Sequence, residues 1–553
     1  MTATQQATGI PAIAEDRARR YRQDGLWNGE LVHERIRTYY TATPGRTAVV
    51  DGDRRMSYRE LGSAVAATRD RLAGLGLSAG DRIAVALGNC AEYVVLVLAA
   101  LELGAVPVLI IPAFREHELD HVFSVTEPVA FAVDGHGRRK EAVATARRLR
   151  DRHPQLRHLL VRGVEPGVGE QDLTVLAAAG AGPVHPWTRA VEPSDPAVFL
   201  LSSGTTGLPK AIPRCHEGYE YMIRSALRVN RMDEHAVNLV VMPAEHGFVM
   251  NCPGLLGTLS VGGRVVLSTP DSPAVAFELV ERERVTHTTL VPSVALRWCA
   301  EAEKTTRDLS SLSVLLVGGA RLAPDVAAKL ETRLGARVQQ CYGMSEGLLC
   351  YTGLDDTDEV VHRTQGRPLS PHDEVRVVDL HGEAVAPGQI GELLTRGPYT
   401  VAGYYRAPGA TIEAFTEDGF YRTGDLVRVD ARGNIEVLGR VRDTINRGGE
   451  KISAEELEDV ILRHSGIAAA ACVAMPHQVL GEVGCLYAVP GAAADGDLDL
   501  RAVRTFLDQQ GIAKYKLPER LELVAELPLT GVGKVDRASL RADIAARLEA
   551  ESR

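Results

Sequence analysis

The chain lacks paired cysteines. Its eight cysteines stand at positions 90, 215, 252, 299, 341, 350, 472 and 485, and no two of them form a C-x-x-C pair. This scattered spacing disfavours both a zinc site and a disulfide framework. We therefore expect most of them to be buried, reduced thiols.

The chain also lacks a basic excess. It has 62 Lys and Arg against 72 Asp and Glu, a net charge of −10, whereas binding to nucleic acid requires a basic face. No apolar run stands behind the charges near its start, so we expect no secretory signal and a cytoplasmic protein. Small molecules or protein partners fit this composition better than nucleic acid.

An uninterrupted membrane span is missing as well. The most apolar segment, residues 93–112, contains Glu102, Gly104 and Pro107. These residues divide it into a helix and a following strand, whereas a spanning helix needs about 20 consecutive apolar residues. We expect a buried helix–strand pair and no contact with a membrane.

What the chain does contain is an alternation of strands and helices. From residue 80 to about 345, short β-branched runs alternate with helical patterns, which predicts an α/β fold of doubly wound parallel sheets with ligands beyond the carboxyl ends of the strands. Short strands over about 370–440 predict a β-rich subdomain. The polar stretch 442–449 is the best linker candidate. The predicted division is an N-terminal core of residues 1–440 and a small α+β C-terminal domain of residues 441–553.

The stretch LSSGTTGLPK, residues 201–210, combines glycines, four hydroxyl side chains and a lysine behind a predicted strand. Glycines let backbone N–H groups converge on an anion, and Lys210 adds a mobile positive charge, so the stretch suits a polyphosphate. It is not a Walker A loop, because Ala211 stands where Ser or Thr belongs; the later GVGKV has Val535 there. An ordinary Gly/Ser turn is the alternative.

A second stretch, GMSEG at residues 343–347, matches the hydrolase pattern G-x-S-x-G with Ser345 as the nucleophile. That motif requires a strand-to-helix elbow and Asp and His partners further along the chain. Asp and His residues do follow, but the residues directly after Ser345 are not typical of the start of a helix. This disfavours a hydrolase.

Five motifs occur in one order along the chain: LSSGTTGLPK, CYGMSEG, YRTGD, GNIEVLGRVRD and PLTGVGK. In this order and spacing they resemble the acyl-adenylate-forming (ANL) superfamily, which includes acyl-CoA synthetases, luciferases and peptide-synthetase adenylation domains. The stretches KAIPRCHEGYEY, TRGPYTVAGYY and INRGGEKISAEELE are most similar to stand-alone aryl acid AMP ligases. Those enzymes activate 2,3-dihydroxybenzoate or salicylate for siderophores and other natural products of nonribosomal peptide synthesis.

The resemblance implies two half-reactions that use ATP and Mg²⁺. The acid's carboxylate attacks the α-phosphate of ATP, and a phosphopantetheine thiol then displaces AMP; the first step depends on alignment and charge stabilisation. The C-terminal domain is expected to be mobile and to rotate between the steps about a hinge at Arg442, where many relatives have Asp or Lys. The chain contains no G-G-x-S-[LI] attachment motif, so we expect a carrier protein in trans, with CoA as the alternative acceptor.

The resemblance also implies an ATP site. Glu346 is expected to hold Mg²⁺, because this hard cation takes oxygen ligands, Tyr342 to stack near the adenine, and Asp425 to bind the ribose. The predicted ATP-binding residues are Ser202, Ser203, Gly204, Thr205, Thr206, Gly207, Lys210, Gly318, Gly319, Ala320, Tyr342, Gly343, Met344, Asp425, Arg440 and Lys534. The predicted catalytic residues are Lys534, Lys210, Glu346 and Arg440. Their presence disfavours the alternative of a non-catalytic binding protein.

The acid is expected to contact the segment EHGFVMNCPG, residues 245–254. Relatives that take 2,3-dihydroxybenzoate resemble H-N-Y-x-x-S-S-P-G, in which the Asn meets the ortho hydroxyl and the second Ser the meta hydroxyl. This chain has Gly247 and Cys252 at those two positions, and cysteine is what salicylate-type ligases carry. A site that cannot satisfy a catechol should not select one. The predicted acid-binding residues are His246, Gly247, Phe248, Cys252, Gly319, Ser345 and Leu349.

We therefore expect salicylate, anthranilate or a related hydroxy- or aminobenzoate as the substrate, and not a catechol. A bicyclic heteroaryl acid that uses the space at Gly247 is the alternative.

Overall fold

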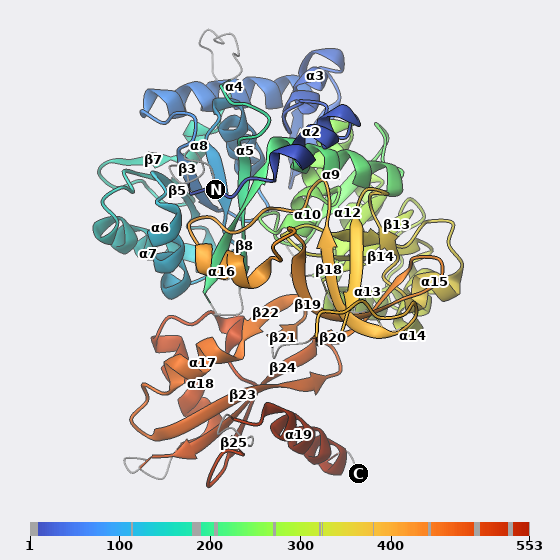
Figure 1. Cartoon of the computed structure of the whole chain (residues 1–553). Coiled ribbons are helices and arrows are strands. Elements are labelled where there is room, and N and C mark those ends of the chain that lie inside the picture. The colour runs from blue at the N-terminus through green and yellow to red at the C-terminus, as the bar shows by residue number, and fades with distance from the viewer. Residues whose placement is uncertain are drawn as a thin grey trace.

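The computed structural model describes residues 9–111, 114–179, 190–203, 208–268, 272–319, 322, 324–379, 381–440, 444–491, 498–528 and 535–551. Residues 9–440, the large domain, lie above residues 444–551, the C-terminal domain, in Figure 1. The strands that the structure describes form four sheets, three in the large domain and one in the C-terminal domain.

Two large sheets form the body of the large domain, and the predicted α/β fold is confirmed. Most of their strands pair in parallel, while the strands at or next to the sheet edges, β2 (Arg54–Ser57), β9 (Pro209–Cys215), β15 (Leu349–Tyr351) and β16 (Arg367–Pro368), pair antiparallel. The nine-stranded sheet has the order β16 (Arg367–Pro368), β15 (Leu349–Tyr351), β14 (Arg337–Gly343), β13 (Val314–Gly318), β12 (His287–Leu290), β10 (Val237–Val240), β11 (Arg264–Leu267), β1 (Thr47–Asp51) and β2 (Arg54–Ser57). The seven-stranded sheet has the order β7 (Glu170–Asp172), β6 (His158–Arg162), β5 (Ala130–Asp134), β3 (Arg82–Ala86), β4 (Val106–Leu109), β8 (Pro196–Ser203) and β9 (Pro209–Cys215).

Helices fill the space between these sheets and cover their outer faces (Figure 1). In the large domain they are α2 (Glu15–Gln23), α3 (Glu34–Ala42), α4 (Tyr58–Gly74), α5 (Ala91–Leu103), α6 (Glu116–Thr126), α7 (Lys140–Arg152), α8 (Leu173–Leu176), α9 (His216–Val229), α10 (Gly247–Asn251), α11 (Gly254–Ser260), α12 (Pro273–Glu283), α13 (Pro292–Ala302), α14 (Pro324–Leu334), α15 (Asp358–Arg363) and α16 (Pro408–Ala414), with a 3₁₀ turn at Gly137–Arg139.

Helix α5 explains the apolar segment 93–112. It contacts β4 of one large sheet and β1 of the other, and a helix enclosed in this way is apolar on all sides. It ends at Gly104, whose φ of 82° is a left-handed conformation that glycine adopts readily, and β4 follows. The predicted helix–strand pair is thus present. Within the described part of the chain, no helix combines the length and apolarity that crossing a membrane requires.

The remaining strands form two smaller antiparallel-rich sheets. In the large domain these are β17 (Glu374–Val378), β18 (Ile390–Arg396), β19 (Tyr421–Val429) and β20 (Ile435–Arg440). In the C-terminal domain they are β22 (Glu450–Ser453), β21 (Thr444–Arg447), β24 (Gly481–Pro490), β23 (Ile467–His477) and β25 (Arg520–Leu523). The C-terminal helices are α17 (Ala454–Ile461), α18 (Leu500–Gln509) and α19 (Arg537–Glu551), with a 3₁₀ turn at Lys514–Lys516.

The predicted linker 442–449 is shorter than expected. Residues from Thr444 onward form the hairpin β21–β22, because Ile445 lies fully buried in the core of the C-terminal domain. Arg442, the predicted hinge, lies outside the described residues. The predicted boundary between residues 440 and 441 stays a prediction for the same reason.

The C-terminal domain packs against α6 through buried charges. Lys516 Nζ lies 2.8 Å from Glu456 Oε2 in its own domain and 3.3 Å from Glu118 Oε1 on α6. Lys516 and Glu118 are fully buried, and the backbone N–H of Ala513 also donates to Glu118 Oε1, at 3.3 Å. A buried ammonium needs charged partners. Because Glu118 belongs to the large domain, this triad is complete only in the domain orientation seen here.

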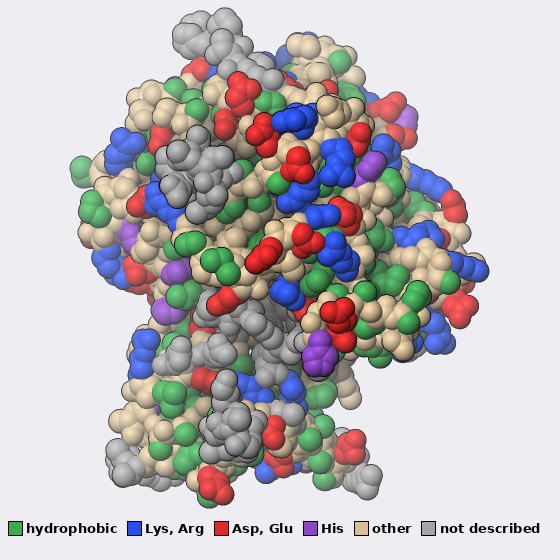
Figure 2. All heavy atoms as spheres, viewed as in Figure 1, with side chains coloured by type: hydrophobic (Ala, Val, Ile, Leu, Met, Phe, Trp, Pro, Cys, Tyr) green, Lys and Arg blue, Asp and Glu red, His purple; other side chains and the backbone are tan. Residues whose placement is uncertain are grey.

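Positive and negative side chains are interspersed over the face of the molecule shown in Figure 2, without a continuous basic surface among the described residues there.

Candidate functional site

The predicted site residues gather where strands of the two large sheets end. Strand β8 ends at Ser203, β13 at Gly318 and β14 at Gly343, and α10 follows the loop after β10. The ring of Phe248 on α10 packs against Gly318, where an added Cβ would lie 2.7 Å from Phe248 Cζ. Position 318 therefore requires glycine. The carboxyl ends of parallel strands are where α/β folds bind ligands.

Lys210 and Glu346 lie on two sides of one tyrosine. Lys210 Nζ is 4.8 Å from the centre of the Tyr404 ring, a cation–π distance. The Tyr404 hydroxyl donates to Glu346 Oε1 at 2.9 Å. Burial, and then the negative charge of Glu346, raise the pKa of Tyr404 far above its usual value, so the tyrosine stays a neutral donor. The predicted phosphate-binding cation and the predicted metal ligand are thus brought together.

Glu346 suits the metal ion that the prediction assigns to it. Its side chain is buried, and Tyr404 orients one carboxylate oxygen. Among the described residues, none donates a hydrogen bond to the second oxygen, Oε2. An oriented carboxylate with one oxygen available is the kind of ligand that Mg²⁺ prefers.

Tyr342 and Asp425 form the second predicted contact with the nucleotide. Tyr342 is the second-last residue of β14, and its hydroxyl donates to Asp425 Oδ2 at 2.7 Å. Asp425 is buried on β19, where it pairs in register with Arg440 of β20. The tyrosine ring predicted to meet adenine and the carboxylate predicted to meet ribose therefore lie side by side.

Cys252 lies where the resemblance predicts the edge of the acid site. Its side chain is buried, and Sγ lies 3.6 Å from the carbonyl oxygen of Gly247. Burial raises the pKa of the Cys252 thiol to about 12, so the thiol is neutral at physiological pH. His246, the N-cap of α10, accepts the backbone N–H of Phe248 through Nδ1 at 3.2 Å.

Asn251 was missed by the sequence prediction although it lies next to Cys252. An added Cβ at Gly247 would lie 3.6 Å from Asn251 Oδ1 and 3.1 Å from Leu200 Cδ1. The Tyr219 hydroxyl donates to Asn251 Oδ1 at 2.6 Å. The signal was available in the sequence, because positions 247 and 251 are one helical turn apart and share a face of α10.

Arg214 forms the wall behind these residues. Its guanidinium donates to the Ser345 carbonyl oxygen at 2.8 Å and lies over the Tyr219 ring at 5.3 Å. Arg214 and Tyr219 also line a cavity of about 650 Å³ together with residues of the N-terminal segment. No predicted site residue lines that cavity. Leu349, also predicted, is buried against Gly343.

The C-terminal domain reaches the acid side of the site. A Cβ added to Gly319 would lie 3.5 Å from the Cα of Gly449, and one added to Gly449 would lie 3.3 Å from Val291 Cγ1. Asn446 Nδ2 also donates to the Gly319 carbonyl oxygen at 3.5 Å. Both glycines have positive φ, 85° and 100°. In this orientation the glycine turn of the C-terminal domain therefore lies directly on the end of β13.

Some predicted site residues lie outside the part of the chain that the structure describes. Gly204, Thr205, Thr206, Gly207, Ala320 and Lys534 lie outside the described residues, as do the side chains of Ser203 and Arg440.

The hydrolase alternative is not supported by the local fold. After Ser345 the chain forms a turn and then β15, not a helix. The strand-to-helix elbow that the hydrolase motif requires is therefore missing at this serine.

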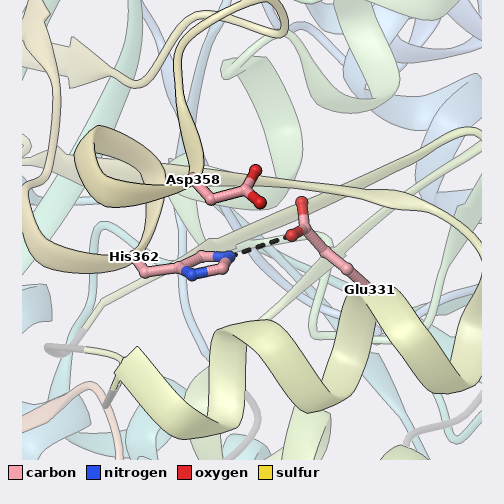
Figure 3. Close-up of side chains that lie close together, drawn as sticks. All are labelled: Glu331, Asp358 and His362. Atoms are coloured by element: carbon pink, nitrogen blue, oxygen red, sulfur yellow. Dashed lines mark hydrogen bonds and ion pairs between the residues drawn. The ribbon is translucent and has the colours of Figure 1, made fainter.

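One group of possible metal ligands lies elsewhere, between α14 and α15 (Figure 3). His362 Nε2 lies 2.9 Å from Glu331 Oε2, and Arg337 Nη1 donates to both Glu331 Oε1 and Asp358 Oδ1 at 2.9 Å. Arg337 opens β14, so this group is at the opposite end of that strand from Tyr342. Arg337 already supplies the cation, and we interpret the group as an ion-pair network.

The chain belongs to the AMP-binding enzyme family, which residues 36–405 match, and residues 456–534 match the AMP-binding enzyme C-terminal domain. It is 44% identical to the 2-hydroxy-7-methoxy-5-methyl-1-naphthoate–CoA ligase of Streptomyces carzinostaticus, over 97% of each chain. It is 45% identical to the salicylyl-CoA synthase/salicylate adenylyltransferase of a Streptomyces species, over 96% of this chain and 97% of the relative.

Among solved structures the chain is similar to apo MbtA of Mycobacterium smegmatis, with a TM-score of 0.74 and 40% identity, over 98% of this chain and 100% of that chain. The predicted membership of the acyl-adenylate-forming superfamily is confirmed, and the protein is an aryl acid adenylate-forming ligase.

Proposed function

We propose that the protein activates salicylate, anthranilate or a related hydroxy- or aminobenzoate with ATP and Mg²⁺ and transfers it to the phosphopantetheine thiol of a carrier protein in trans. The observation that carries the choice of acid is the buried, neutral Cys252 beside Gly247. A thiol is a weak hydrogen-bond partner, so a meta hydroxyl would lose its hydrogen bonds to water without replacing them. Such a site disfavours catechols.

In the first half-reaction a carboxylate oxygen of the acid attacks the α-phosphorus of ATP, and the bond to the bridging oxygen of pyrophosphate breaks. Lys534 aligns the carboxylate with the α-phosphate, and Lys210 neutralises the departing pyrophosphate. Tyr404 orients the Glu346 carboxylate by donating a hydrogen bond to Oε1. The Mg²⁺ ion, when bound at Glu346, supplies positive charge next to the phosphate oxygens.

In the second half-reaction the thiol sulfur attacks the carbonyl carbon of the aryl adenylate, loses its proton, and AMP leaves with the electrons of the acyl–oxygen bond. The contact between Gly449 and Gly319 supports an orientation in which the C-terminal domain closes over the acid side. Glycine at both positions lets the backbones of the two domains approach this closely.

A bicyclic aryl acid is the second candidate. Gly247 places no side chain next to Leu200, whose Cδ1 would lie 3.1 Å from a Cβ at that position. The relative from Streptomyces carzinostaticus is named for a naphthoate, a bicyclic acid, and for CoA. We therefore keep CoA as the alternative acceptor.

The test is ATP–pyrophosphate exchange with a panel of aryl acids, followed by thioester formation with CoA and with a phosphopantetheinylated aryl carrier protein. We expect salicylate or a close monocyclic relative to exchange most strongly. Strongest exchange with 2,3-dihydroxybenzoate would contradict the argument from Cys252, and strongest exchange with a bicyclic acid would select the second candidate. No exchange with any aryl acid would refute the proposed function.

A further inference from the structure

The cavity of about 650 Å³ lies outside the site described above. It is enclosed by the N-terminal segment 10–18, the start of α9 and the loop 398–402, and its volume is within the range of small-molecule sites, about 300–1,000 Å³. Its apolar lining includes Ile10, Ile13, Trp27, Tyr399 and Val401. Ala12 and Glu15, which also line it, are exposed, so one edge of the cavity meets solvent.

Four charged side chains line this cavity, and three of them have partners of opposite charge. Arg22 donates to both carboxylate oxygens of Glu217, at 2.8 and 3.0 Å, and Glu15 accepts from Arg19 at 3.2 Å. The fourth is Arg214, and no carboxylate of the described residues lies within ion-pair distance of it. The positive charge of Arg214 is therefore the one that the cavity wall does not balance.

The Arg214 guanidinium is also short of hydrogen-bond acceptors. Its side chain is 3% exposed. Of its five N–H donors, the described residues engage one with the Ser345 carbonyl oxygen, at 2.8 Å, and one with Met222 Sδ, at 3.5 Å. Sulfur is a weak acceptor, and a buried charge without an opposite charge is costly. The arrangement indicates an anion that binds Arg214 from the cavity.

Two hydrogen bonds join the wall of the cavity to the turn that carries Glu346. One is the bond from Arg214 to the Ser345 carbonyl oxygen. The other runs from the backbone N–H of Val401 to the Glu346 carbonyl oxygen, at 2.8 Å. An anion that draws the guanidinium toward the cavity weakens the first bond. Occupancy of the cavity and the position of Glu346 are therefore linked.

We propose that this cavity is a second small-molecule site, which binds an aliphatic monocarboxylate such as a medium-chain fatty acid. Its carboxylate pairs with Arg214, and its chain lies along the apolar wall. A neutral chain lacks the ion pair, and a second charge on the chain would be buried against apolar groups. Occupancy loosens the turn at Ser345 and lowers the affinity for MgATP. The site is independent of the proposed function, and only its link to MgATP rests on that function.

The experiment compares octanoate with octanamide, a neutral molecule of nearly the same shape, in calorimetric titrations of the whole chain. We expect the Kd for octanoate to be about tenfold lower, because only octanoate forms a charge-assisted hydrogen bond with Arg214. Arg214→Met should remove this preference. Arg228→Met, at an exposed arginine of α9, should keep it.

Two further measurements locate the ligand. Bromine quenches tryptophan fluorescence on contact, so 8-bromooctanoate should quench the wild-type chain and have little effect on Trp27→Phe. Ala18→Phe introduces a large side chain into the cavity from α2 and should weaken both octanoate and octanamide by about tenfold. The thermal unfolding midpoint reports whether each variant is folded. The octanoate–octanamide comparison and the quenching test the site even where Arg214→Met does not fold.

Equal Kd values for octanoate and octanamide in the wild type, or an octanoate Kd unchanged in Ala18→Phe, would overturn the site. Saturating MgATP should raise the octanoate Kd by about threefold; an unchanged value, with MgATP binding shown in the same calorimeter, would overturn the link to Glu346. A chain that exchanges with no aryl acid but binds octanoate as described would refute the proposed function and support this site.

Discussion

The two sides of the site are built from different kinds of residue. The nucleotide side, Lys210, Tyr342, Glu346 and Asp425, consists of charged groups joined to tyrosines by short contacts. The acid side, which includes Gly247, Asn251, Cys252 and Gly319, has no charged side chain among these four. Charged side chains suit ATP, because its phosphates are the same whichever acid is activated. Small neutral side chains suit the aryl acid, because its shape can vary.

This difference predicts two kinds of defect. Damage to the nucleotide side should slow adenylation of every acid by the same factor, because every acid uses the same ATP. Damage to the acid side should change the ranking of acids or the second half-reaction and leave the use of ATP intact.

Lys534→Ala should have the largest effect. Removing the charge that pairs with the α-phosphate is expected to lower exchange by about 10²–10³-fold with every acid. Thioester formation from supplied aryl-AMP should be nearly unchanged, because that step does not use this lysine. Separate end-point assays of exchange and of thioester formation measure the two effects. Lys514→Ala, at an exposed lysine, is the control. Equal loss in the two half-reactions would show that the role is wrong.

Glu346→Gln should lower exchange by about 100-fold. The amide oxygen can still accept from Tyr404, so the fold is kept, but the loss of the negative charge weakens Mg²⁺ binding. A magnesium titration should therefore shift to higher concentration, by the same factor for each acid. The exposed Glu413→Gln serves as the control. An unchanged magnesium titration would show that the ion does not bind at Glu346.

The two sides also differ in how many of their residues could be predicted from the sequence. Lys210, Glu346 and Asp425 could be predicted as site residues because charged residues in ordered motifs have few other uses, and the alternating apolar runs predicted the parallel interiors of the sheets. Asn251 was missed because only its spacing from Gly247 is visible in the sequence, whereas its hydrogen bond from Tyr219 joins residues 32 positions apart. The contact between Gly319 and Gly449 joins residues 130 positions apart, and a strand pattern carries no information about the orientation of two domains.

Gly449→Val tests the contact on the acid side. A Cβ at this position would lie 3.3 Å from Val291 Cγ1, and its φ of 100° is strained for valine. We expect thioester formation to fall by about tenfold or more and exchange to be unaffected. The matched control is Gly433→Val, which has a φ of 82° but open space around it. If exchange falls as much as thioester formation, the contact does not belong to the second half-reaction.

Glu118→Gln tests what holds the C-terminal domain in its orientation against the large domain. Its carboxylate completes the charge balance of Lys516 across the domain interface, and glutamine retains a hydrogen bond without the charge. We expect thioester formation to slow by about fivefold, with little effect of salt because the group is buried. Glu456→Gln, the partner within the C-terminal domain, should lower thermal stability and slow both half-reactions. A slower exchange reaction in Glu118→Gln would contradict a role limited to this orientation.

Cys252→Ser should have the smallest effect on rate and the clearest effect on selectivity. A hydroxyl is a stronger donor and acceptor than the neutral thiol, and the site is otherwise unchanged in size. The ratio of kcat/KM for 2,3-dihydroxybenzoate to that for salicylate should rise by about fivefold, while the KM for ATP stays the same. Cys299→Ser, on α13 and only partly buried, should leave the ratio as it is. An unchanged ratio in Cys252→Ser would mean that the thiol does not face the meta position.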